Sequence, residues 1–380
     1  MPPAISELEL TRFRGLRDVA LRELGRVNLV VGENNSGKTS VLEALALAAN
    51  PLEPWNWMGV AARREPSRSR SRTIAERIRW LFPQHASEGP ATLYDGSIEI
   101  SISGNTPSRR LTAQYAEMRS APDQTMLPLE SRASTSSDDL PDRDDDDVVP
   151  ERWGCRVEVA SEDRAGRFAR GAFTWWDGER FEGPPPGPPL LPCQVVTPYD
   201  HLFRAVPARR YSDARRSGPT ATVVDLLSAI DPRITGIEVL AARGPVPFKS
   251  AEAVVYLRDQ RAGLLPVEAF GDGMRRILIL ALAISTARGG VLLIDEIETA
   301  IHVSALGRVF RWVVEACMEH DVQMFATTHS LEAIDAILAA DTTPADDIVG
   351  FRLGAHGDRT QRYGEALLRR LRLERGADVR

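Results

Sequence analysis

The sequence is poor in the residues that build disulfide frameworks and structural metal sites. It has three cysteines and six histidines in 380 residues. Cys155, Cys193 and Cys317 lie far apart, and no CxxC or Cys/His ligand spacing accompanies them. We therefore expect reduced thiols in a cytoplasmic protein, and neither a disulfide scaffold nor a zinc site.

Long apolar runs, a leader and a basic charge balance are also missing. The longest apolar stretch, residues 277–287, is shorter than the roughly 18 residues that a membrane span needs and fits a buried helix. The N-terminus has no apolar core with a cleavage site, so we expect no signal peptide and no membrane partner. The net charge of −6 excludes a global basic field, so any DNA contact would have to be a local patch.

Apolar runs alternate with helical patterns in the last third of the chain. This alternation predicts βαβ units on a parallel sheet. The expected helices span residues 273–288, 304–319 and 331–340, and the expected strands span residues 291–294, 322–326 and 348–353. Near the N-terminus we expect strands at residues 5–10, 19–24 and 26–31 and a helix at 39–50; shorter strands are expected at 95–103, 156–160, 237–240 and 253–257.

Residues 53–190 differ from both flanks in composition. Residues 131–150 are polar and acidic, including the run Asp142 to Asp147, and we expect them to be a mobile, solvated segment. The Arg/Ser run, which contains Arg63, Arg64, Arg68, Arg70 and Arg72, could grip phosphate backbones, but a solvated loop is the simpler interpretation. Trp175 and Trp176 could stack on bases, but core packing is the favoured interpretation. No repeat and no sustained heptad pattern occurs.

One stretch, VGENNSGKTS, matches the phosphate-binding pattern GxxxxGK[ST] between a predicted strand and a predicted helix. Glycines let backbone N–H groups converge on a phosphate, and the helix N-terminus adds partial positive charge. Lys38 would reach the β- and γ-phosphates of ATP, and Thr39 would bind Mg²⁺. The alternative is an ordinary turn between a strand and a helix. The predicted nucleotide cradle consists of Gly32, Glu33, Asn34, Asn35, Ser36, Gly37, Lys38, Thr39 and Ser40.

Acidic and imidazole groups follow two later apolar strands. In VLLIDE, Asp295 and Glu296 come at the carboxyl end of a buried strand, where ligands of parallel sheets bind. Asp295 would hold Mg²⁺, and Glu296 would act as the catalytic base on the attacking water, with Glu298 as the alternative base. His329 follows the next strand and would contact the γ-phosphate. A solvated acidic turn and a structural histidine are the alternatives.

Together these motifs resemble the ABC-type ATPases of the RecF/SMC/OLD group, in particular the OLD-like, AAA-named ATPases. ELELTRFRGLRDVALREL is similar to the group's opening strands, DEIETAIHVSAL to its Walker B motif and D-loop, and TTHS to its histidine switch. FGDGMRR resembles a degenerate ABC signature, in which Gly271, Asp272 and Gly273 would contact the γ-phosphate held by a second copy. Gln194 is a candidate Mg²⁺ ligand only because it lies in the interval where the group places its Q-loop.

The resemblance implies an α/β fold, a P-loop NTPase head of the ABC type. Such a head has two lobes, a central, mostly parallel sheet and an antiparallel β subdomain, here with a compact insertion. We expect residues 1–52 to begin the first lobe, 53–190 to be the insertion, 191–355 to complete the head and 356–380 to form a tail. The C-terminal nuclease domain of larger OLD relatives has no counterpart here, so we expect no intrinsic nuclease activity.

The implied function is an ATP- and Mg²⁺-dependent head dimer, with a higher oligomer as the alternative assembly, that switches a separate effector. The effector would be a nuclease or toxin in anti-phage defence. The alternative from another class is a RecF-like clamp that binds DNA with ATP as a latch. A transporter ATPase subunit fits less well, because of the 257-residue gap between Lys38 and Asp295 and the D-loop ETAIHVSAL.

Overall fold

The computed structural model describes residues 3–64, 73–84, 93–106, 108–120, 152–177, 181–183, 189–203, 205–217, 221–241, 253–340, 347–354 and 359–380. The segment 131–150 with its acidic run lies outside these residues, as do Arg68, Arg70 and Arg72. No helix among the described residues is both long and apolar enough to span a membrane.

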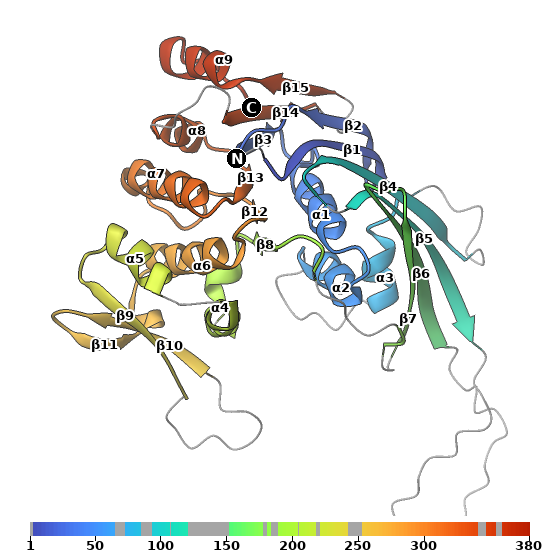
Figure 1. Cartoon of the computed structure of the whole chain (residues 1–380), viewed down its shortest axis with the longest axis horizontal. Coiled ribbons are helices and arrows are strands. Elements are labelled where there is room, and N and C mark those ends of the chain that lie inside the picture. Colours follow the sequence, from blue (N-terminus) through green and yellow to red (C-terminus); the bar gives the residue numbers. More distant parts are fainter. Residues whose placement is uncertain are drawn as a thin grey trace, which may run out of the picture.

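A six-stranded, mostly parallel sheet runs through the centre of the molecule (Figure 1). Its strands, in spatial order, are β15 (Thr360–Tyr363), β14 (Ile348–Leu353), β3 (Val27–Gly32), β13 (Gln323–Thr327), β12 (Val291–Ile294) and β8 (Cys193–Val196). All neighbouring pairs are parallel except the edge pair β14–β15. The carboxyl ends of β3, β12 and β13 therefore meet at one edge of the sheet, where ligands of such sheets bind.

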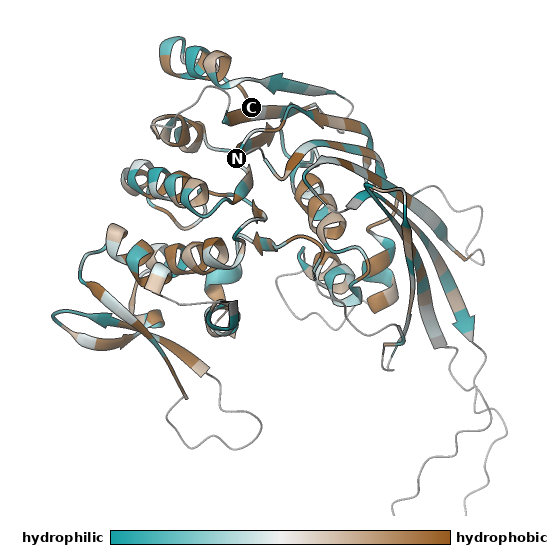
Figure 2. Cartoon of the chain, in the orientation of Figure 1, coloured by the Kyte–Doolittle hydropathy of each residue, from teal (hydrophilic) through white to brown (hydrophobic). Residues whose placement is uncertain are grey.

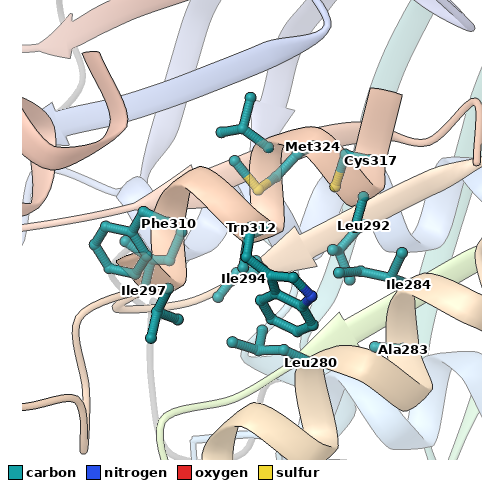
Figure 3. Close-up of a cluster of buried hydrophobic side chains, with 14 of the residues drawn as sticks. Leu280, Ala283, Ile284, Leu292, Ile294, Ile297, Phe310, Trp312, Cys317 and Met324 are labelled. Carbon is teal, nitrogen blue, oxygen red and sulfur yellow. The ribbon is translucent and has the colours of Figure 1, made fainter. Parts of the chain in front are cut away.

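A layer of helices covers one face of this sheet (Figure 1). It consists of α4 (Ala205–Ser217), α5 (Ala221–Ile230), α6 (Asp272–Thr286), α7 (Val303–Glu319) and α8 (Leu331–Leu338). Figure 3 shows side chains of α6 and α7 meeting those of β12 and β13 in a buried cluster. Leu292 and Ile294 belong to this core, whereas Val291 and Leu293 belong to the core on the other face, as the two-residue period of a strand requires.

The helix α1 (Lys38–Ala49) lies on the opposite face, between the parallel sheet and a second sheet (Figure 1). All of its residues except Thr39 are buried. This helix has no polar face because it packs against strands of both sheets, β3 and β13 on one side and β4 and β5 on the other.

The second sheet is antiparallel and has six strands in the order β2 (Leu16–Arg22), β1 (Ile5–Phe13), β4 (Asp95–Gly104), β5 (Ser108–Ser120), β6 (Arg152–Asp163) and β7 (Phe168–Trp176). The strands alternate hydrophobic and hydrophilic residues, and Figure 2 shows this alternation along the sheet. The buried face packs with α1, α2 (Pro54–Ala62) and α3 (Ile74–Arg79) in one core. Because β4 pairs directly with β1, residues on both sides of position 52 share one sheet and one core.

The remaining elements are short. A three-stranded antiparallel sheet of β11 (Gly263–Pro266), β10 (Ala253–Asp259) and β9 (Ile234–Ala241) packs against α4 and α5. Single 3₁₀ turns span Asp200–Leu202 and Val267–Ala269, and the chain ends in α9 (Glu365–Arg369) and a π-helical turn, Arg370–Glu374.

The predicted fold class is confirmed: a mostly parallel central sheet is joined to an antiparallel sheet in a two-lobed α/β structure. Trp175 is buried against Phe173 and Phe181, so core packing is the correct interpretation for this residue. Arg63 and Arg64 differ from the solvated loop expected for them, because both lie at the end of α2 beside α1.

Candidate active site

The loop between β3 and α1 has the backbone conformation of a phosphate cradle. Gly32 and Gly37 have φ values of +144° and +95°, which side-chain-bearing residues rarely adopt. A Cβ atom on Gly32 would also lie 2.6 Å from the carbonyl oxygen of Leu353. The loop is therefore built for glycine at both positions, and it places the N-terminus of α1 at its centre.

Two polar side chains of this loop have bonding capacity that suits a phosphate. Lys38 is only 6% exposed, and its Nζ donates to the carbonyl oxygens of Gly32 (2.8 Å) and Glu33 (2.7 Å). Burial lowers the pKa of Lys38, while the nearby carboxylates oppose this shift. Ser36 Oγ is buried and has no hydrogen-bond partner among the described residues. A phosphate in the cradle would satisfy Ser36 and draw Lys38 from the carbonyl groups.

A carboxylate from the second strand faces the cradle. Thr39 Oγ1 lies 3.1 Å from both carboxylate oxygens of Asp295. Thr327, at the end of β13, donates to Asp295 Oδ1 at 2.6 Å, and its Oγ1 accepts a hydrogen bond from the amide of Glu296 at 2.8 Å. A hydroxyl and a carboxylate at one point are oxygen ligands of the kind that Mg²⁺ prefers. These residues fit the metal, although no group of three or more acidic, His or Cys ligands occurs among the described residues.

The two other acidic residues of this edge differ in environment. Glu296 is exposed, has a φ of +47°, and accepts a hydrogen bond from the Thr299 hydroxyl at 3.3 Å. Glu298 Oε1 accepts from the backbone amide of His329 at 2.9 Å, and its Oε2 is buried without a partner in the described structure. Glu296 is thus accessible to substrate, whereas Glu298 holds the turn that carries His329.

The structure brings seven of the predicted site residues to one cleft of about 860 Å³. Its lining includes Asn35, Ser36, Gly37, Lys38, Thr39, Ser40 and His329. Glu33 and Asn34 are the exposed tip of the same loop. Asp295 and Glu296 line a smaller adjoining pocket together with Thr39.

Two predicted groups lie away from this cleft. Gly271 precedes α6 and Gly273 is in its first turn, where a Cβ atom on Gly273 would lie 3.3 Å from the carbonyl oxygen of Ala300. Asp272 forms an ion pair with Arg275. None of residues 271–273 lines the cleft. Gln194 lies within β8, two residues before its end, and accepts a hydrogen bond from Arg210 at 3.1 Å. Neither the signature residues nor Gln194 meets the cradle of its own chain.

Three features of the site have roles that the sequence motifs do not assign. Arg276, fully buried in α6, donates to the carbonyl oxygens of Thr197, Asp295 and Glu296 and so holds the acidic edge to the helix. Burial lowers its pKa to about 10, which leaves it charged at neutral pH. Thr327 positions Asp295, as described above.

The third feature is the outer wall of the cleft. Arg14 donates to the carbonyl oxygen of Trp80 at 3.0 Å and forms an ion pair with Glu43 at 2.7 Å. Arg64 joins the same carboxylate at 2.8 Å. Trp80 lines the cleft with 48% of its surface exposed. An exposed indole beside a phosphate cradle is a surface on which a planar ring can stack.

Comparison with known proteins gives the family. The family described as "AAA domain, putative AbiEii toxin, Type IV TA system" matches residues 27–335, well over half of the chain.

Curated relatives match over short stretches. Two uncharacterised proteins of Methanocaldococcus jannaschii, MJECL11 and MJECL10, are 41% identical over 68 residues and 46% identical over 49 residues. The DNA replication and repair protein RecF of Teredinibacter turnerae is 42% identical over 48 residues. These stretches cover 18%, 13% and 13% of this chain and 60%, 22% and 13% of the relatives, so the chain matches less than two thirds of each relative's length.

Two solved structures are similar over nearly their whole length. One is an Smc head bound to the C-winged helix domain of ScpA, with a TM-score of 0.46, 16% identity and coverage of 95% of this chain and 98% of that chain. The other is the Smc head domain with an extended coiled coil bound to the C-terminal domain of ScpA, derived from Pyrococcus furiosus, with a TM-score of 0.45, 13% identity and coverage of 99% and 100%.

The match over residues 27–335 and the strand–loop–helix cradle facing Asp295 agree. The chain belongs to the AAA-domain family described as putative AbiEii toxin, type IV TA system.

Proposed function

We propose that this chain binds Mg-ATP in the cradle, hydrolyses it between two copies and uses this cycle to switch a separate effector. One observation carries the proposal: Thr39 from α1 and Asp295 from β12 face each other at 3.1 Å beside the cradle. Residues 256 positions apart meet there, which an ordinary strand–helix turn would not require.

In this proposal, the position of each residue in the site determines its role. Lys38 and the N-terminus of α1 bind the phosphates, and Ser36 offers its buried hydroxyl. Thr39 and Asp295 hold Mg²⁺, which when bound neutralises charge on the phosphates. Glu296, the exposed carboxylate, orients and deprotonates the attacking water, and His329 in the cleft lining contacts the γ-phosphate. Trp80 stacks on the nucleobase.

A second copy completes the site. Gly271 and Gly273 present the N-terminus of α6, yet they do not line the cleft of their own chain. A phosphate bound between two heads would meet the cradle of one and α6 of the other. The homodimer, assembled by ATP and released by hydrolysis, is then the switch.

The dimer acts on a separate effector protein. The family's description names a putative toxin of a type IV toxin–antitoxin system, which supports a role in anti-phage defence with a nuclease or toxin as partner. The match to RecF favours a second candidate, a DNA-binding clamp latched by ATP, with no effector. In either case we expect no nuclease activity from this chain alone.

The experiment uses Glu296→Gln, which removes the base and keeps the shape. We expect this variant to bind ATP, hydrolyse it at least about a hundredfold more slowly and accumulate as a dimer in light-scattering measurements. Glu298→Gln is the matched control, because Glu298 is bonded to the His329 amide. If Glu298→Gln alone stops hydrolysis, the base is Glu298. Two further assays on the Glu296→Gln dimer distinguish the two candidate functions. Co-purification with the product of an adjacent gene supports the effector switch, and capture on duplex DNA supports the DNA clamp.

A further inference from the structure

A second pocket, of about 460 Å³, lies between the two lobes and is distinct from the ATP cleft. We call it the interlobe pocket. Asn50 at the end of α1, Asn56 and Arg63 of the α2 region line it from one lobe, and Gln194 of β8 and Arg210 of α4 line it from the other. Figure 1 shows β8 passing between these two groups of helices. The volume is in the range that small-molecule sites have.

Arg63 is the unusual member of this lining. Its Nη1 atom is buried without a hydrogen-bond partner, and the guanidinium forms no ion pair with any described residue. Burial lowers the pKa of Arg63, and Cys193, Glu43 and Asp200 oppose this shift, in that order. A buried guanidinium N–H without a partner destabilises the protein, and a bound anion would remove this cost.

The nearby carboxylates do not neutralise Arg63. Glu43 is bound by Arg14 and Arg64, at 2.7 and 2.8 Å. Asp200 is bound by Arg210 at 2.8 Å and by the Thr197 hydroxyl. Glu53, which lines the pocket together with Asp200, accepts from the amide of Trp55 as the N-cap of α2. Each of these carboxylates therefore has its own donors.

Two further donors share the pocket with Arg63. Arg210 Nε is buried and has no partner within the described residues. Gln194 also lines the pocket. Its side-chain carbonyl oxygen accepts a hydrogen bond from Arg210, and its NH₂ group takes no part in that bond. Three N–H donor groups from α2, β8 and α4 thus surround one space. Donors from several directions suit a tetrahedral oxyanion better than a planar carboxylate, which two parallel N–H bonds from one side satisfy.

We propose that the interlobe pocket binds the phosphate group of a small molecule, held by Arg63 together with Gln194 and Arg210. Carbonyl, amide and apolar groups of the lining, including Ala46 and Leu191, would contact the rest of that molecule.

The pocket is joined to the acidic edge of the ATP site. Arg63 also lines the adjoining pocket that contains Thr39, Asp295 and Glu296. The turn after β8 continues from the pocket to Arg276, which binds the carbonyl oxygens of Thr197 and Asp295. Occupancy of the interlobe pocket would therefore fix the distance between α2 and the turn beside Glu296, and thereby regulate hydrolysis.

Inorganic phosphate is the probe, and Lys38→Ala is the background that weakens phosphate binding in the ATP cradle. Calorimetric titration of Lys38→Ala should show phosphate binding, with sodium chloride at equal ionic strength as the blank. Lys38→Ala/Arg63→Met should bind phosphate at least about tenfold more weakly, since a charge-assisted contact contributes this much or more. Lys38→Ala/Arg209→Met is the matched control, because Arg209 is the exposed neighbour of Arg210 on α4 and should leave phosphate binding intact.

Thermal unfolding distinguishes a loss of phosphate binding from a loss of folding stability. Without phosphate, Lys38→Ala/Arg63→Met should unfold at the same or a higher temperature than Lys38→Ala, because the change removes a buried N–H donor that has no partner. With phosphate, Lys38→Ala should gain stability and Lys38→Ala/Arg63→Met should not. The proposal is overturned if Lys38→Ala does not bind phosphate, if Arg63→Met binds it as tightly as its parent, if acetate binds in its place, or if Arg63→Met is strongly destabilised.

Discussion

Thr327, the first residue of TTHS, provides a test of the metal site that the motif itself does not suggest. Its hydroxyl donates to Asp295 Oδ1 at 2.6 Å and accepts from the Glu296 amide at 2.8 Å, and the residue is 1% exposed. Thr327→Val keeps the shape and removes both bonds. The hydrogen bond to the carboxylate contributes about 1.5–3 kcal/mol, and leaving the buried amide without a partner costs about 1–3 kcal/mol.

Part of this loss should appear as weaker metal binding, because Asp295 would be held by Thr39 alone. We expect the Mg²⁺ concentration for half-maximal ATP hydrolysis to rise at least about tenfold, equivalent to about 1.4 kcal/mol. The assay is steady-state hydrolysis as a function of Mg²⁺ at saturating ATP. Thr327→Ser, which keeps the hydroxyl, should restore most of the metal affinity.

Thr328→Val is the matched control for this prediction. Thr328 is equally buried, but its hydroxyl bonds with Ser330, at 3.0 Å from the Ser330 amide, and not with Asp295. Its Mg²⁺ requirement should stay within about twofold of the wild type, well below the tenfold step. Wild-type Mg²⁺ dependence in Thr327→Val, or an equal increase in Thr328→Val, would refute the assigned role.

Three further predictions concern the nucleotide site. Lys38→Ala removes the charge at the phosphates and should weaken ATP binding or turnover at least about tenfold; unchanged hydrolysis contradicts the cradle. Gly273→Asp places a carboxylate at the start of α6 and should spare ATP binding but stop hydrolysis, and mixing it with Lys38→Ala should restore one composite site per heterodimer; mixtures that never exceed the summed rates indicate sites complete within each chain. Trp80→Ala should raise the Kd for ATP about fivefold or more, the size of a lost stacking contact, and leave inorganic triphosphate binding unchanged; an equal loss for both ligands contradicts stacking on the base.

The sequence predicts the cradle and the acidic strand because both depend on local patterns. Apolar runs before Gly32 and Asp295 define strands, and the bounds of β12 agree with the prediction to the residue. The helix after the cradle begins at Lys38 rather than Thr39, a difference of one residue. Parallel strands then bring their carboxyl ends together without further information.

Contacts between distant segments could not be predicted in this way. Alternation in residues 95–103 shows a strand with two different faces, but nothing local says that β4 pairs with β1 as well as with β5 of its own region. Thr327 and Arg276 lie within TTHS and FGDGMRR, but these motifs assign no role to either residue, and Trp80 lies outside every motif. Their roles arise from neighbours that are far away in sequence, and the same holds for Gln194, whose partner is Arg210.

Residues 53–190 also illustrate this limit. Composition separates them from both flanks, whereas the structure makes β4 to β7 four of the six strands over α1. Deleting the region would expose the face of α1 that packs on β4 and β5. Partner-binding tests should therefore use point substitutions on the exposed face of this sheet and not truncation.

The burial of α1 has a consequence for motion. A helix packed between two sheets cannot turn or slide without displacing one of them, so a shift of the phosphate cradle is coupled to a movement of one sheet against the other. The backbone amides of its middle and last turns have no route to solvent short of separating the two layers, and their hydrogen exchange should report global unfolding. Its first turn lines the open cleft, so the nucleotide is bound at an end of the helix that remains accessible.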